Sequence, residues 1–322
     1  MLDTLRKVKG AVATKDFVPV MTHFYIYEGR IQALDGRLAI DAPLPELPGV
    51  TAAIPAEKLI KAVDACTAEP TITIKDGVMM LKQGRLKVRL PVQPSEAFPK
   101  KDPDLHTADF ATIGLLPMLR KIRPFIATDE TRRWATGALL MPSGEAYATN
   151  NVSMLRVECP MLTALQVPIN LPGHAIDELL RIGEEPISFG LSATSVTFYF
   201  HGDWWLTCQL INNSWPLETI AKLFADFPAD LPPLPPGAFE ALKTVASFAE
   251  NPKLKAVELG NGAISTPEGQ QSAAFEGFDF APGLFNADYL QLVFEIATSF
   301  GGGEPSKFAG EGFTGLIIGM RR

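Results

Sequence analysis

One helical pattern occurs three times along this chain of 322 residues, and it restricts the possible folds more than any other feature. Each copy opens with an apolar residue followed by Pro or Asn, at Ile54-Pro55, Leu171-Pro172 and Phe285-Asn286, so the copies lie 117 and 114 residues apart. Apolar residues then recur at helical spacing with polar residues between them, which is typical of a helix with one buried face. The repetition predicts three similar modules.

Other elements recur around these helices. A second amphipathic helix is predicted at the start of each third, over residues 2–12, 115–126 and 239–248. Short strands separated by turns are predicted after the first two repeated helices, over residues 71–74, 78–81, 85–90, 186–189, 196–200 and 204–207. We therefore predict an α+β fold of three tandem modules, each with two helices and an antiparallel sheet, as domains 1–107, 108–228 and 229–322. Two or three unrelated α+β domains are the alternative.

Composition places the chain among soluble globular proteins, because 47% of its residues are hydrophobic and 20% are charged. No apolar run approaches the roughly 18 residues of a membrane helix, and the first residues lack the pattern of a signal peptide. The three cysteines, Cys66, Cys159 and Cys208, are far apart, which argues against a disulfide scaffold or a cysteine zinc site. We expect a cytoplasmic protein in a reducing compartment.

The charge is distributed unevenly among the predicted domains. The net charge of −7 divides into +2 for residues 1–107, −4 for residues 108–228 and −5 for residues 229–322. An acidic protein is not expected to bind nucleic acid indiscriminately. A local basic surface is still compatible with this distribution, and the first third is where we expect it.

Four further segments complete a recognisable set. They are Phe17-Val18-Pro19-Val20, which we expect to form a strand after the first helix, residues 127–137 (ATDETRRWATG), residues 146–152 (AYATNNV) and residues 317–322 (IIGMRR). Together with the repeat, and in this order, they resemble the β sliding clamp of bacterial DNA polymerase III over essentially the whole chain. The resemblance implies a DNA-clamp fold in which each chain forms half of a closed ring. It also implies a homodimer around double-stranded DNA that tethers the replicative polymerase and is opened by an ATP-dependent clamp loader.

A clamp that slides needs attraction to phosphates without reading of bases. Basic residues lie off the apolar stripe of the two opening helices, and the resemblance adds the residues after them. The candidate DNA-binding residues are Arg6, Lys7, Lys9, Lys15, Arg120, Lys121, Arg123, Arg133 and Trp134. An ordinary solvated helix face is the alternative for each one. In the last third only Lys243 remains, so we expect weaker attraction there.

The resemblance also implies an apolar pocket for a short peptide from the polymerase or the loader. The candidate pocket residues are Ala135, Thr149, Asn151, Val152, Ser153, Met154, Pro216, Ile318, Gly319, Met320 and Arg321. Ordinary packing in the core or at the chain end is the alternative for the apolar members.

Charge suggests how two chains would pair. Residues 85–90 alternate basic and apolar side chains, so one face of this strand would be cationic. A +2 domain would then meet a −5 domain of a second chain and favour head-to-tail pairing. The candidate interface residues are Arg85, Lys87, Leu90, Phe248, Glu268 and Glu276. Protection of an edge strand against aggregation is the alternative use of its charges.

The sequence gives little support for catalysis. The four histidines have no metal-ligand spacing, and no phosphate-binding glycine motif occurs, so we expect no cofactor, no metal and no enzyme activity. His201 with Asp203 is the nearest approach to an acid–base pair, and an α+β enzyme that uses it is one rival hypothesis. A clamp-like interaction scaffold that does not encircle DNA is the other.

Overall fold

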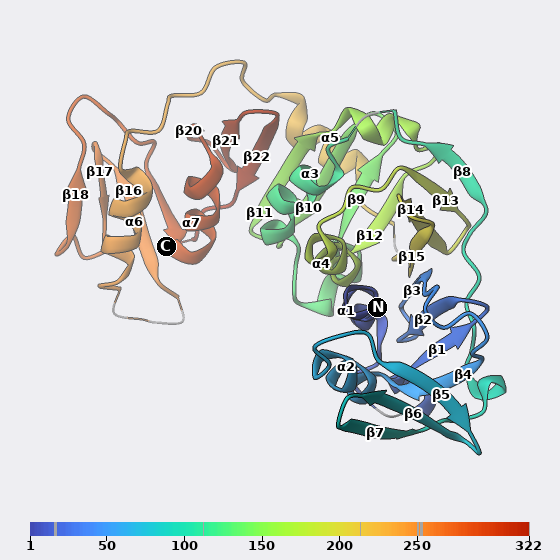
Figure 1. Cartoon of the computed structure of the whole chain (residues 1–322). Coiled ribbons are helices and arrows are strands. Elements are labelled where there is room, and N and C mark those ends of the chain that lie inside the picture. The colour runs from blue at the N-terminus through green and yellow to red at the C-terminus, as the bar shows by residue number, and fades with distance from the viewer. Residues whose placement is uncertain (16–17, 112, 213, 250, 252–253, 322) are drawn as a thin grey trace. The chain divides into compact units, whose positions relative to one another are not determined.

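The computed structural model describes residues 1–15, 18–111, 113–212, 214–249, 251 and 254–321 (Figure 1). By its internal contacts the chain divides into two compact units. Unit 1 is Met1–Ile113 with Asp177–Leu210, and unit 2 is Gly114–Ile176 with Ile211–Arg322. Helices accompany antiparallel sheets in both units, which confirms the expected α+β class. The three domain boundaries expected from the repeat stay a prediction.

Unit 1 contains an eight-stranded antiparallel sheet in the order β4-β1-β2-β3-β15-β14-β13-β8. Its strands are β1 (His23–Tyr27), β2 (Arg30–Leu34), β3 (Leu38–Pro43), β4 (Ala52–Pro55), β8 (His106–Asp109), β13 (Ser188–Leu191), β14 (Ser195–Phe200) and β15 (Trp204–Gln209). The pairing of β3 with β15, with Ile40 opposite Leu206, joins strands from the first and second thirds of the sequence. Helix α1 (Leu2–Val8) packs on β2 and β3 through buried Leu5 and Val8.

A three-stranded sheet completes unit 1, in the order β5-β6-β7. Its strands are β5 (Thr71–Lys75), β6 (Val78–Gln83) and β7 (Leu86–Pro91), and helix α2 (Ala56–Asp64) contacts β7, β1 and β4. The expected strands over residues 71–90 are therefore confirmed. Because β7 pairs only with β6, its other edge is open within the described residues, and basic side chains alternate along it.

Unit 2 contains a seven-stranded antiparallel sheet in the order β12-β9-β10-β11-β22-β21-β20. Its strands are β9 (Gly137–Met141), β10 (Glu145–Thr149), β11 (Ser153–Glu158), β12 (Ile169–Pro172), β20 (Ser299–Gly301), β21 (Ser306–Gly310) and β22 (Phe313–Ile317). Helix α3 (Leu115–Ile122) packs on β10 and β11. The central pairing of β11 with β22 places Met154 opposite Leu316, so a strand near the chain end completes a sheet that begins in the middle third.

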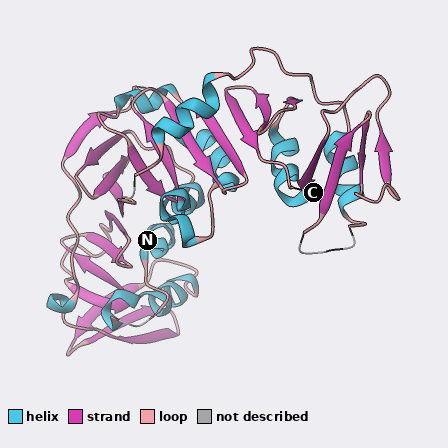
Figure 2. Cartoon of the chain, turned by 180° about the vertical axis from the view of Figure 1, so that it is seen from behind, coloured by secondary structure: helices cyan, strands magenta, loops and turns pink. Residues whose placement is uncertain are grey.

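Three further helices and a small sheet belong to unit 2. The sheet has the order β18-β17-β16-β19, with β16 (Ala256–Gly260), β17 (Ala263–Ser265), β18 (Ser272–Ala274) and β19 (Gly283–Asn286). Helices α6 (Ala238–Ala246) and α7 (Ala287–Ile296) pack on each other and on this sheet, whereas α5 (Leu217–Ala225) lies in the preceding segment. Helix α4 (Gly173–Ile182) spans the residue at which the two units divide. Figure 2 shows the helices in cyan and the strands in magenta from behind.

Most expected helices are confirmed, and three local expectations are wrong. A strand was expected over Phe17–Val20, but Pro19–Thr22 form a 3-10 helix, with the fixed φ of Pro19 suited to its first turn, and Phe17 lies outside the described residues. The expected helices over residues 2–12 and 115–126 both end early, at Val8 and Ile122, and continue as 3-10 turns. No helix among the described residues is long and apolar enough to cross a membrane.

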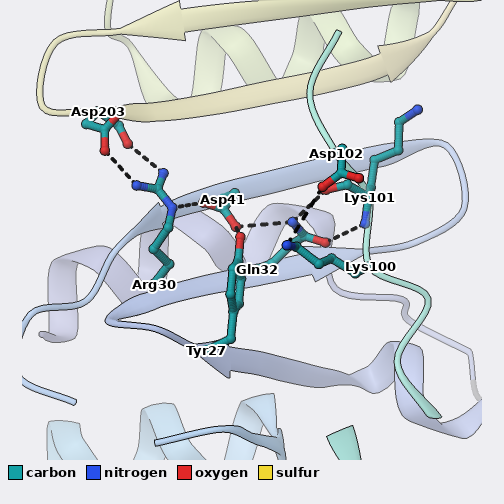
Figure 3. A network of polar contacts seen from close by, with 8 residues as sticks. All are labelled: Tyr27, Arg30, Gln32, Asp41, Lys100, Lys101, Asp102 and Asp203. Atoms are coloured by element: carbon teal, nitrogen blue, oxygen red, sulfur yellow. Dashed lines mark hydrogen bonds and ion pairs between the residues drawn. The ribbon is translucent and has the colours of Figure 1, made fainter. Parts of the chain in front are cut away.

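A buried carboxylate organises the polar interior of unit 1 (Figure 3). Asp41 on β3 is 0% exposed, and it accepts hydrogen bonds from Tyr27 Oη at 2.6 Å, Arg30 Nε at 2.6 Å and Gln32 Nε2 at 3.1 Å. The other end of the Arg30 guanidinium donates to the carboxylate and the carbonyl of Asp203, in the turn between β14 and β15. Burial, with the adjacent carboxylate, raises the pKa of Tyr27, so its hydroxyl stays a donor.

The same network holds the segment that leads from β7 to β8. The Gln32 side-chain amide donates to the carbonyl of Lys101 at 2.9 Å and accepts from its N–H at 2.8 Å. Further along, the Asp104 carboxylate accepts from Ser195 Oγ at 2.7 Å and Thr197 Oγ1 at 3.0 Å. Polar side chains of the sheet therefore hold this connecting segment at Lys101 and at Asp104.

Gly315→Ala is expected to destabilise unit 2. Gly315 on β22 lies opposite Phe308 on β21, and a Cβ at position 315 would overlap the fully buried Phe308 ring. Overpacking of this kind costs about 1–3 kcal/mol, which should lower the denaturant midpoint measured by intrinsic fluorescence. Gly49→Ala is the matched control, because a Cβ there meets no atom within 4 Å. Equal midpoints for the two variants would contradict the role of Gly315.

Candidate functional site

A cavity of about 230 Å³ lies in unit 2 among residues from three distant parts of the sequence. The segment before β9, together with β10, β11 and the turn between them, forms one wall. Helix α5 forms a second wall. Strand β22, with the residues around it, forms the third. Its lining residues are Arg132, Trp134, Thr149, Asn151, Val152, Ser153, Met154, Pro216, Thr219, Ile220, Leu223, Pro305, Leu316 and Ile318.

Hydrogen bonds fix the turn between β10 and β11 that forms one side of this cavity. Asn150 Oδ1 accepts from the N–H groups of Val152 at 3.1 Å and Ser153 at 2.7 Å, while Thr149 Oγ1 donates to the Ser153 carbonyl at 2.8 Å. Asn151 has a φ of 71°, a left-handed conformation that Asn tolerates better than most residues. The Ile318 N–H donates to the Val152 carbonyl at 2.9 Å, so the chain end is bonded to this turn.

The floor of the cavity is apolar. Ile220 and Leu316 are 4% and 3% exposed and belong to a buried cluster with Trp215, against which Trp134 and Met154 pack. The Trp134 and Trp215 rings meet edge to face with their centroids 4.7 Å apart. A preformed apolar cavity of this size can accept large apolar side chains of a bound segment without first repacking the core.

Among the described residues that line the cavity, Arg132 is the single charged one. Its Nη1 lies 3.3 Å from Asn151 Oδ1, and the side chain is exposed at the cavity. The preceding turn is fixed by Asp129, whose carboxylate accepts from Thr131 N at 2.9 Å and Thr131 Oγ1 at 2.6 Å. These hydrogen bonds lower the pKa of Asp129, so the turn keeps its acceptor in mildly acidic solution.

The structure brings together seven of the eleven expected pocket residues: Thr149, Asn151, Val152, Ser153, Met154, Pro216 and Ile318. The other four lie outside the lining. Ala135 is buried, and Arg321 is exposed. Met320 N donates to the carbonyl of Leu284 in β19, and a Cβ added to Gly319 would lie 3.2 Å from the same carbonyl.

Several lining residues were not expected from the sequence. Thr219, Ile220 and Leu223 come from α5, whose apolar spacing (Leu217, Ile220, Leu223, Phe224) is a helical signal that lies outside the threefold repeat. Pro305 and Leu316 join the cavity through the pairing of β11 with β22. Trp134, a candidate DNA-binding residue, also lines this cavity and packs against its buried cluster.

The basic residues in and after the first helix differ in their contacts and exposure. Arg6 pairs with Asp64 at 2.7 Å on an exposed surface. The Lys7 ammonium pairs with Glu184 at 2.7 Å and lies 4.2 Å from the Trp204 ring centroid. Lys7 is therefore engaged by contacts inside unit 1. Lys9 and Lys15 are exposed. Arg6 and Lys9 line a larger cavity of about 730 Å³, together with Lys58 and Arg181.

The corresponding residues of unit 2 divide in the same way. Arg120 on α3 and Arg133 are exposed, and Arg123 follows α3 in a 3-10 turn. Lys121 donates to the carbonyl of Glu311 at 2.9 Å and lies 4.8 Å from the Phe313 ring centroid. Lys243 on α6 pairs with Glu240 at 3.2 Å. Lys9, Arg120 and Arg133 are thus exposed cations that form no ion pair among the described residues.

The expected interface residues differ in exposure and in the elements that carry them. Arg85 and Lys87 are exposed beside and on β7, whereas Leu90 is 3% exposed and packs inside unit 1. In unit 2, exposed Glu268 and Glu276 flank the edge strand β18 in sequence. Phe248, beyond α6, is 55% exposed.

Of the possible acid–base pair His201 and Asp203, Asp203 has a structural role. Asp203 is held by Arg30, with Oδ2 2.6 Å from Nη1, while His201 is exposed in the same turn. Among the residues that the structure describes, no three His, Cys, Asp or Glu side chains group as a metal site. The turn therefore contributes to the Asp41 network.

Solved structures with the same fold span the whole chain. A DNA polymerase sliding clamp from Bacillus subtilis superposes with a TM-score of 0.82 at 16% identity, and a beta sliding clamp from C. crescentus with 0.81 at 22%. A Helicobacter pylori beta clamp bound to DNA ligase peptide gives 0.78 at 15%. Each comparison covers 100% of this chain and 97% of the other.

Sequence comparison gives no such match: no family model matches the chain, and no curated protein matches it. At these identities the structural likeness establishes the fold, which is the fold of bacterial DNA polymerase III beta sliding clamps.

Proposed function

We propose that this chain, which has the fold of the bacterial beta sliding clamps, is itself a DNA sliding clamp that encircles duplex DNA and tethers the replicative polymerase. The observation that carries the proposal is the extent of the likeness, since it covers all of this chain and nearly all of each clamp. The function is mechanical: binding, closure and sliding require no cofactor and no catalysis, and an ATP-dependent loader opens the ring. The cytoplasm, a reducing compartment, is the proposed location.

The ring is proposed to contain two chains of three modules each, with boundaries near residues 107 and 228. Head-to-tail pairing would bring the basic edge of β7 to the acidic last module of a second chain, with Arg85 and Lys87 near Glu268 and Glu276. Opposite charges select this orientation, although each exposed pair adds at most about 1 kcal/mol. Phe248, exposed beyond α6, supplies an apolar contact. A solution mass of twice 34.9 kDa is the expected result.

Retention on circular DNA tests the central claim. A closed ring should stay on nicked circular duplex after loading and should leave when the circle is linearised, because only topology holds it. A clamp-like scaffold that does not encircle DNA would show no difference between circular and linear DNA. That outcome would overturn the proposal in favour of the scaffold.

Charge reversal of the exposed cations should weaken DNA attraction. Lys9→Glu with Arg120→Glu is expected to slow loading and to flatten the dependence of DNA affinity on salt, since each lost phosphate contact lowers the slope by about 0.9. Lys75→Glu is the control, because it reverses one charge on exposed β5, outside both helices. Equal salt slopes for the double variant and the control would count against these helices as the DNA-facing surface.

The cavity of unit 2 is proposed to hold a short peptide from the polymerase or the loader. Two observations support this role: its floor is apolar and preformed, and a clamp with the same fold has been solved with a DNA ligase peptide. Apolar anchors buried in such a floor would supply most of the affinity.

A further inference from the structure

Strand β5 of unit 1 lies at an open sheet edge, and the internal repeat shows that the corresponding edge is covered elsewhere in the chain. One strand follows the repeated helix in each third: β5 follows α2, β13 follows α4 and β20 follows α7. The outer edge of β13 pairs with β8, and that of β20 pairs with the segment at Pro233. Within the described residues β5 pairs only with β6, so no strand covers its outer edge.

The open edge leaves exposed the kind of apolar side chain that the covered edges bury. Ile74 on β5 lies opposite fully buried Met79, so it points to the core face of the sheet, yet it is 37% exposed. By contrast, Phe189 on β13 and Phe300 on β20 are 0% and 3% exposed. Phe110, which follows β8, packs on Phe189 with the ring centroids 5.1 Å apart. A strand added beside β5 would bury Ile74 in the same way.

The backbone of β5 also offers hydrogen bonds at this edge. The two-residue turn Asp76-Gly77, with φ of 51° and 70°, closes the hairpin of β5 and β6 and makes Lys75 and Val78 a hydrogen-bonded pair. Because hydrogen-bonded and other pairs alternate along an antiparallel ladder, the N–H and C=O groups of Ile72 and Ile74 point away from β6. Strand β5 contains no proline and its register with β6 is unbroken, so it lacks two features that commonly protect such edges.

Charge on the other face of this sheet indicates what a covering segment should carry. That face presents alternate residues of β5, β6 and β7, and its charged members are all basic: Lys75, Lys82, Lys87 and Arg89. A second copy of β5 would bring the same cations to the pairing, which disfavours association of two chains through this edge. A segment with acidic side chains on this face would be attracted instead.

We propose that the open edge of β5 is a docking site for an extended segment of a partner protein in which apolar and acidic residues alternate. The segment pairs antiparallel with β5, as β8 does with β13. Its apolar side chains cover Ile72 and Ile74, and its acidic side chains lie on the basic face. Main-chain pairing supplies the affinity, and the alternation selects the segment. The site is separate from the cavity of unit 2, and the inference does not depend on DNA binding.

N-methylated peptides test the pairing. The probe is a fluorescent heptapeptide with blocked ends and four glutamates that alternate with three valines, mixed with the full chain in low salt and followed by anisotropy. Residues that face each other across a ladder point to the same side of the sheet, so the valine amides meet Ile72 and Ile74 while the glutamate amides point away. N-methylation of the valine amides should weaken binding about tenfold or more, and N-methylation of the inner glutamate amides should change it little.

The peptide results can contradict the proposal in several ways. Equal effects of the two methylation patterns, or no binding of the unmodified peptide, would overturn it. A peptide with lysine in place of glutamate should bind more weakly, and equal binding would overturn the preference for acidic segments. Leu223→Glu, in the cavity of unit 2, should bind the peptide as the parent does; a loss there would place the peptide in that cavity and overturn the β5 site.

Proline substitutions assign the binding to one edge of the sheet. Ile74→Pro removes an outward N–H without breaking the ladder with β6, and it should weaken peptide binding about tenfold. Lys87→Pro is the matched control, because the pair of Gln83 with Leu86 closes the next hairpin and directs the Lys87 N–H outward at the opposite edge. A larger loss in Lys87→Pro would place the peptide on β7 and overturn the proposal.

Two further measurements complete the test. Thermal unfolding shows whether each proline variant is folded, and the methylated peptides decide the question with the parent chain if one is not. The solution mass of Ile74→Pro should equal that of the parent. A lower mass would show that a second copy already covers β5, which would also overturn the proposal.

Discussion

Leu223→Glu is expected to abolish peptide binding to the cavity of unit 2 while the chain stays folded. Leu223 is half-buried on α5 and faces the cavity, so a carboxylate there reaches solvent in the free protein. A bound apolar anchor would cover that carboxylate and leave it unpaired, at a cost of about 3 kcal/mol or more. The affinity should fall about 100-fold or further, as measured by fluorescence anisotropy with a short fluorescent peptide that carries large apolar side chains.

The neighbouring residue provides the control for this experiment. Lys222→Glu introduces the same carboxylate one position away on the exposed side of α5, and it should leave peptide affinity nearly unchanged. Thermal unfolding of both variants shows whether α5 is intact. Peptide binding that survives Leu223→Glu in a folded protein would show that partners dock elsewhere.

Asp41→Ala is expected to destabilise unit 1 by about 3–5 kcal/mol, the usual effect of removing one partner from a buried ion pair. The substitution leaves the Arg30 Nε and the Tyr27 hydroxyl without their acceptor in a region where Asp41 was fully buried. Because Gln32 also bonds to Lys101, the segment leading to β8 should loosen as well. Chemical denaturation followed by fluorescence measures the loss, with Trp204 and Trp205 reporting on unit 1.

Asp203→Ala shows how much the exposed side of the Arg30 network contributes to stability, in comparison with the buried side at Asp41. Asp203 binds the same arginine, but its side chain is 86% exposed, so its removal should cost no more than about 1 kcal/mol. Hydrogen exchange of residues 100–104 should rise in Asp41→Ala and stay near the parent value in Asp203→Ala. Similar stability losses in both variants would mean that burial of Asp41 is not what gives the network its strength.

Local periodicity predicted the helices well. The repeated apolar stripes predicted α2, α4 and α7, and the structure has these helices at Ala56–Asp64, Gly173–Ile182 and Ala287–Ile296. Helix α5 was missed because it lies outside the repeat, although its own apolar spacing was readable. The 3-10 turn at Pro19–Thr22 was mistaken for a strand because its short apolar run has no helical period.

The site was only partly predictable, for a physical reason. The turn at residues 149–154 is local, so a resemblance could identify its residues. Leu316 and Pro305 reach the same cavity only through strand pairing between distant segments, which no local pattern encodes. Likewise, the helical stripe showed that Lys7 lies off the buried face of α1, but not that Glu184 and Trp204 would engage it.

The pairing of β11 with β22 also has a consequence for how the chain is made. Ser153 pairs with Ile317, so during synthesis β11 leaves the ribosome well before the strand that will cover its edge. At roughly 5–20 residues per second, a delay of roughly 8–30 s separates the two. An unpaired edge is a template for association with other chains throughout that interval. The nascent protein should therefore depend on chaperones most while its last 160 or so residues are still being translated.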